Sequence, residues 1–117
     1  MQRFLDLFNF FKKPSSVITV EPNSRLYVLC NRHLAPMYAA VQGGHAVAQW
    51  MIEHPDNTWQ NKTLIFVKAD IHYAQEQLDG ADYSKWLEPD MDDACTAIAV
   101  MATNENIQFL KSLKLLS

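Results

Sequence analysis

Three polar side chains in the sequence have the types needed to hydrolyse an ester: Gln42, Asp90 and Thr96. Ester hydrolysis needs a water held at the carbonyl carbon, a group that accepts its proton, and donors for the developing oxyanion. Asp90 could act as the base or position the water, Thr96 could donate to the oxyanion, and Gln42 could orient the water or the substrate. Each residue also has a purely structural explanation, since Asp is common in turns and Thr is favoured in strands.

Five further side chains could bind a substrate beside them. In an open α/β sheet, functional groups gather at the carboxyl ends of the strands. Arg32 and His33 follow one expected strand, and Lys68 follows the next. Tyr38 and His45 lie on the polar stripe of the helix between these strands, although a histidine in that setting is more often structural.

That helix is expected from Pro36 to about residue 54, because proline at a first helical position loses no hydrogen bond. Gly43 and Gly44 inside it each cost roughly 1 kcal/mol relative to Ala, which is typical of a helix that lies close to a sheet or a ligand. At about 100° per residue, the polar stripe comprises Tyr38, Gln42, His45, Gln49 and Glu53. The side expected to face the sheet comprises Met37, Val41, Gly44, Val47, Ala48, Met51 and Ile52.

The elements around this helix alternate between strands and helices. The apolar runs predict strands over residues 26–30, 63–67, 83–87 and 96–101, and the remaining periodic segments predict helices over residues 71–78 and 105–113. This order predicts one α/β domain over residues 25–117, with a mixed open sheet of about four strands and helices on both faces.

Residues 1–24 are expected to form an N-terminal amphipathic helix, over residues 1–13, followed by a linker. Phe4, Phe8 and Phe11 share its apolar side. Asp6 interrupts the apolar run and argues against a signal peptide. We expect this helix to dock on the domain or on a second copy, giving a homo-oligomer, and favour this over an interfacial membrane helix.

The composition narrows the class of protein. The chain has 117 residues, 49% of them hydrophobic, and no apolar run approaches the ~20 residues that span a bilayer. A net charge of −3 argues against a broad nucleic-acid footprint. Cys30 and Cys95 are expected to be buried free thiols, which indicates a reducing compartment and hence the cytoplasm. The histidines lack the spacing of zinc ligands, so we expect neither a metal nor a cofactor.

The stretch from Leu34 to Gln42-Gly-Gly-His-Ala resembles the first helix of the type 2 peptidyl-tRNA hydrolases, whose pattern is D-L-x-M-x-x-G-K-x-A-A-Q-x-x-H-A. The run K-T-L-I-F-V-K from Lys62 resembles the second strand of that family. The segment L-E-P-D followed by T-A-I-A resembles its D-A-G…T-V-L-A segment, so the likeness covers roughly residues 26–100. It implies an α/β fold and cleavage of the ester that joins a peptide or an amino acid to tRNA.

Tyr38 stands where this family has its catalytic lysine, and His33 stands where it has an aspartate. The electrostatic role of the lysine could pass to Arg32, to Lys68 or to no residue. Two functions therefore remain open: a hydrolase acting on acylated tRNA or a small acyl ester, and a non-enzymatic binding or assembly module on the same fold. The residues that keep the family's type are Gln42, His45, Asp90 and Thr96.

Overall fold

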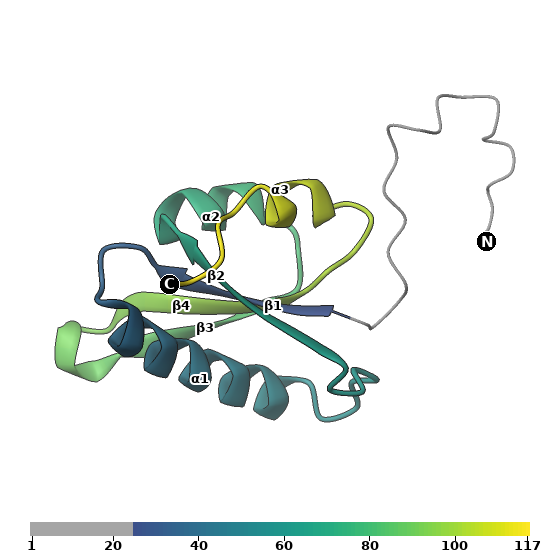
Figure 1. Cartoon of the computed structure of the whole chain (residues 1–117). Coiled ribbons are helices and arrows are strands. Elements are labelled where there is room, and N and C mark those ends of the chain that lie inside the picture. Colours follow the sequence, from purple (N-terminus) through teal and green to yellow (C-terminus); the bar gives the residue numbers. More distant parts are fainter. Residues whose placement is uncertain (1–24) are drawn as a thin grey trace, which may run out of the picture.

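The computed structural model describes residues 25–117, and the helix and linker expected over residues 1–24 lie outside the described residues. Strands and helices follow one another in the predicted order, with a short 3-10 turn between the last two strands (Figure 1). The elements are β1 (Arg25–Asn31), α1 (Pro36–Glu53), β2 (Thr63–Ala69), α2 (Ile71–Gln77), β3 (Tyr83–Glu88), η3 (Pro89–Met91), β4 (Ala94–Met101) and α3 (Ile107–Lys111).

The four strands form one mixed sheet in the order β2-β1-β4-β3. β1 and β2 run parallel, with Arg25 opposite Thr63 and Asn31 opposite Ala69, whereas β4 runs antiparallel to both β1 and β3. α1 covers one face of the sheet, and α2 and α3 lie on the other (Figure 1). The prediction of one α/β domain with an open, mixed sheet of about four strands is confirmed.

Cover on both faces explains why β1 is apolar at successive positions. Residues 26–30 are at most 5% exposed. Tyr27 and Leu29 belong to the core cluster formed with α2 and α3, whereas Leu26 and Val28 belong to clusters packed under α1. A strand between two layers of helices has no polar face, so its sequence is a continuous apolar run.

The side of α1 that faces the sheet differs from the expected one. The expected side is largely open to solvent: Met37 is 82%, Val41 53% and Ile52 71% exposed. The prediction was wrong because apolar character alone does not set the rotation of a helix when small residues on another side allow a closer approach to the sheet. The buried residues of α1 are Ala39, Gln42, Gly43, Ala46 and Trp50.

The two adjacent glycines of α1 have different surroundings. A Cβ at Gly43 would lie 2.6 Å from Phe66 Cε2, 2.9 Å from Cys30 Sγ and 2.9 Å from Val28 Cγ1. A Cβ at Gly44 would meet nothing within 4 Å. Gly43 therefore sets the close approach of α1 to the sheet, and Gly44 has no such role within the described chain.

The outer edge of β2 is covered by the segment that follows α3. The backbone N–H of Lys68 donates to the carbonyl of Lys114 (2.8 Å), and that of Leu116 donates to the carbonyl of Phe66 (3.0 Å). Backbone groups that would otherwise form an open edge are thus paired. No helix within residues 25–117 has the length and apolar character needed to cross a membrane.

The two cysteines are free. Cys30, on β1, is fully buried beneath α1, and burial raises the pKa of its thiol to about 12. Cys95 is only half-buried, and burial raises the pKa of that thiol as well. The prediction of a buried thiol is confirmed for Cys30 and holds only in part for Cys95.

Candidate functional site

All the side chains proposed for chemistry come from one end of the sheet. β1 ends at Asn31 beside the end of β2 at Ala69, and antiparallel β4 begins at Ala94 at this same end. α1 starts here, and the hairpin between β3 and β4 turns here (Figure 1). The mixed topology therefore gathers residues that are far apart in the sequence.

A buried polar contact joins α1 to β4 at this end. Thr96 Oγ1 donates to Gln42 Oε1 over 2.6 Å, and both residues are at most 2% exposed. The side chain of Gln42 also hydrogen-bonds the carboxylate of Glu88. Since the amide oxygen accepts from Thr96, it is the amide nitrogen that donates to Glu88. The orientation of Gln42 is thereby fixed by a partner on each side.

Glu88 is the centre of this cluster, and the sequence analysis did not single it out. The residue is 7% exposed, its Oε2 accepts from the backbone N–H of Asp90 (3.0 Å), and its Oε1 accepts from Trp86 Nε1 (3.3 Å). These bonds, with that of Gln42 and the nearby His45, lower the pKa of the Glu88 carboxyl. The bond from Asp90 contributes most. Glu88 is therefore an ionised acceptor at neutral pH, held mainly by neutral donors.

The capping role of Glu88 could have been predicted from its position immediately before Pro89. An acidic residue before a proline that opens a helical turn can accept from the turn's free N–H groups, and Glu88 is the N-cap of η3.

His45 lies on the outer side of this cluster. Its ring stacks on the indole of Trp86, with the ring centroids 4.3 Å apart and the planes inclined by 12°. His45 belongs to α1 and Trp86 to β3, so the stacked rings form a contact between the helix and this edge strand of the sheet. The histidine remains exposed and is available to a ligand.

The other proposed residues lie around this cluster or beside it. Asp90 lies two residues beyond Glu88 and exposes its side chain, and Tyr38, 41% exposed, lies one helical turn before Gln42. Arg32 instead pairs with Asp70 at 3.6 Å and donates from Nε to His33 Nε2 at 3.5 Å. The backbone N–H of Lys68 bonds the segment after α3. Gln42 and Thr96 are thus in direct contact, whereas Arg32 and His33 lie together beside Asp70, the N-cap of α2.

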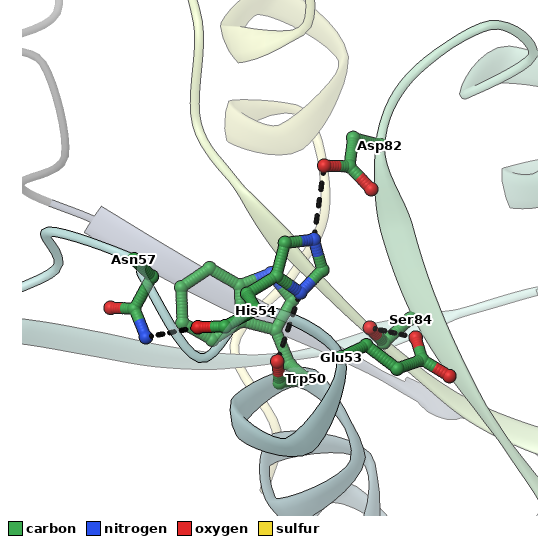
Figure 2. A network of polar contacts seen from close by, with 6 residues as sticks. All are labelled: Trp50, Glu53, His54, Asn57, Asp82 and Ser84. Carbon is green, nitrogen blue, oxygen red and sulfur yellow. Dashed lines mark hydrogen bonds and ion pairs between the residues drawn. The ribbon is translucent and has the colours of Figure 1, made fainter.

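A second polar network lies at the opposite end of α1 (Figure 2). His54 Nδ1 lies 2.9 Å from the carbonyl oxygen of Trp50, and His54 Nε2 lies 3.0 Å from Asp82 Oδ2. Burial alone would lower the pKa of His54, but these two acceptors and the charges of Asp82 and Glu53 outweigh it and raise that pKa. Beside His54 and Asp82 is a cleft of about 730 Å³, a volume typical of small-molecule sites.

The chain matches no family model and no curated protein.

The two ends of α1 offer different chemistry. The amino end of α1, where the sequence predicted the site, presents exposed Tyr38, His45 and Asp90 around buried hydrogen bonds. This arrangement suits orientation of a polar ligand. The cleft at the other end contains none of the eight predicted site residues. Within residues 25–117 no group of three metal-ligating side chains is found.

Proposed function

We propose that the chain hydrolyses the ester of peptidyl- or aminoacyl-tRNA at the end of the sheet formed by α1 and the β3–β4 hairpin. The observation that carries the proposal is the 2.6 Å hydrogen bond between Thr96 and Gln42. Both residues keep the type found in the type 2 peptidyl-tRNA hydrolases, and they lie on different elements. Their contact is expected if the resemblance reflects a shared site, and it has no explanation in the local sequence.

Asp90 is the proposed base or water-positioning group. Its backbone N–H is held by Glu88, which fixes the position of the turn, while its side chain is exposed. Thr96 and Gln42 are the proposed positioning pair below it. His45 and Tyr38 flank the position where the terminal nucleotide and the acyl group would lie. With these roles, the reacting carbonyl would lie at the protein surface between the exposed side chains, where a large substrate can reach it.

The basic residues suit the phosphates of the same substrate. Arg32, His33 and Lys68 lie at the ends of β1 and β2, next to the start of α1. Basic side chains at these positions would contact the phosphates even though the chain carries a net charge of −3. The buried thiol of Cys30 suits a reducing compartment, so we place the protein in the cytoplasm.

A direct assay tests the proposal: release of tRNA from peptidyl-tRNA and from aminoacyl-tRNA by the native chain and by Asp90→Asn. We expect Asp90→Asn to abolish most of the turnover. Asp92→Asn is the matched control, because Asp92 lies in the same turn at φ 54°, a conformation that Asn tolerates well. Equal loss in both variants, or no turnover by the folded native chain, would contradict the proposal.

Tyr38 favours a second function, a non-enzymatic module that binds a ligand or partner at the same surface. Tyr38 stands at the position of the family's lysine, and loss of one group that stabilises an oxyanion commonly costs ~10²–10³ in turnover. If the chain is a hydrolase, Tyr38→Lys is expected to raise its turnover. A chain that binds acylated tRNA but does not cleave it, with or without Tyr38→Lys, would be the binding module.

A further inference from the structure

α1 is apolar on two opposite sides, and only one of them meets the sheet. The residues on the side that faces away from the sheet, here called the outward arc, span roughly 120° around the helix axis at about 100° per residue. None of them has a charged or polar side chain. The largest members of the arc are Met37, Val41, Met51 and Ile52, which are 82%, 53%, 45% and 71% exposed. The full arc comprises Met37, Ala40, Val41, Gly44, Ala48, Met51 and Ile52.

This arc is unusual for a surface helix. A helix that covers one face of a sheet normally carries polar and charged residues on its outer side. Here the outer side runs apolar for the whole 18-residue helix, about 27 Å at 1.5 Å per residue. Contiguous apolar surface of this kind marks an interaction site more often than a chance grouping.

Gly44 indicates how closely the partner approaches. It lies in the middle of the outward arc, it is exposed, and a Cβ there would meet nothing within 4 Å. Packing against the sheet accounts for Gly43 but not for Gly44. A small residue at the centre of a helix face lets a second helix come close, with the axes near the lower limit of about 8 Å.

Two pairs of residues in the arc are placed symmetrically about Gly44. Met37 and Met51 lie seven residues before and after it, and Ala40 and Ala48 lie four residues before and after it. In an antiparallel pair of identical helices crossing at Gly44, Met37 of one copy would therefore meet Met51 of the other, and Ala40 would meet Ala48. Self-complementarity of this kind is what a two-fold interface requires.

We propose that α1 pairs with α1 of a second copy of this chain, antiparallel and crossing at Gly44. The antiparallel arrangement also places the positive amino end of each helix dipole beside the negative carboxyl end of the other. α1 has no acidic residue in its first turn and no basic residue in its last. One helix face is smaller than the ~800 Å² per partner of a stable interface, so the dimer is weak and reversible.

This proposal does not depend on the proposed hydrolase function. It differs from assembly through residues 1–13, because the contact surface lies wholly within α1. Sedimentation velocity of the full chain, from about 1 μM to about 1 mM, tests it first. We expect the average mass to rise toward twice the monomer mass with concentration.

Two variants of the full chain distinguish this surface from others. Gly44→Gln fills the crossing point and Val41→Lys places a charge in the arc, and both should return the mass to that of a monomer. Gln108→Lys, at an exposed position of α3 on the opposite face of the sheet, is the control and should leave the association unchanged. A native chain that stays monomeric throughout, or a dimer that survives both α1 variants, would overturn the proposal.

Cysteine cross-linking tests the orientation. In the antiparallel pair the two copies of residue 37 lie 14 residues apart along the axis, about 21 Å, while residue 37 lies opposite residue 51. Mixing Met37→Cys with Met51→Cys should therefore give mostly the mixed disulfide, with native chain and Gln108→Cys as controls. A parallel pair would give mostly Met37→Cys and Met51→Cys homodimers, and that result would also overturn the proposal.

Discussion

The adjacent glycines of α1 allow one small substitution to be made in two opposite environments. Alanine in place of Gly44 adds a methyl group in open space, and helix propensity favours Ala over Gly by about 1 kcal/mol. We expect Gly44→Ala to stabilise the monomer by about that amount. Alanine in place of Gly43 gains the same propensity, but its methyl group would lie 2.6 Å from Phe66 and 2.9 Å from Cys30 and Val28.

Overpacking of a closed core typically costs about 1–3 kcal/mol, and three contacts under 3.0 Å indicate the upper part of that range. After the gain of about 1 kcal/mol in propensity, Gly43→Ala should still be destabilising, by up to about 2 kcal/mol. Thermal unfolding at low protein concentration measures the difference without a contribution from association. For a domain of this size, 1 kcal/mol corresponds to roughly 4–8 °C in Tm, so the two variants should shift Tm in opposite directions. If both variants raised Tm equally, Gly43 would not be limiting the helix–sheet distance, and the account of the α1 packing would be refuted.

Three further predictions concern the polar networks at the two ends of α1. Thr96→Val leaves the buried Gln42 oxygen without its donor and should lower the free energy of unfolding by about 1–3 kcal/mol, as measured by urea titration. Unchanged stability would show that water replaces the hydroxyl. The pKa of Glu88 is lowered from 4.5, so its contribution to stability is present above that pH and is lost as the pH falls through the lower folded-state value. Glu88→Gln should therefore make the free energy of unfolding less dependent on pH in this acidic range. An unaltered pH profile would contradict the role assigned to Glu88. The pKa of His54 is raised from 6.5, so its contribution to stability is full below that pH and is lost as the pH rises through the folded-state value. NMR titration should show a His54 pKa above 6.5 that falls in Asp82→Asn. An equal pKa in Asp82→Asn would exclude the ion pair as a cause of the shift.

The periodicity of the sequence predicted the elements well. The apolar runs over β1 and β4 are typical of strands covered on both faces, the run over β2 marked the edge strand, and Pro36 marked the start of α1. The alternation of strands and helices then left few topologies that bury every apolar surface. Local physical chemistry was sufficient at this level.

The rotation of α1 could not be predicted in this way. The helix has two apolar sides, and the choice between them depends on Gly43 lying above Cys30 and Val28, which are distant in the sequence. Gln42 followed the same rotation: it is buried because Thr96 and Glu88 supply its partners. The central role of Glu88 depends on the same three-dimensional arrangement, so it could not be derived from spacing along the chain.

The order of the strands has a consequence for how the chain folds. β4 is the last strand in the sequence, yet it lies between β1 and β3 and forms ladders with both. Until β4 is in place, β3 has no strand to pair with and β1 is paired on one side only. Contacts of large sequence separation must therefore form together, which slows folding and makes it cooperative. We expect the domain to fold in a single slow step, with no stable intermediate made from the residues before β4.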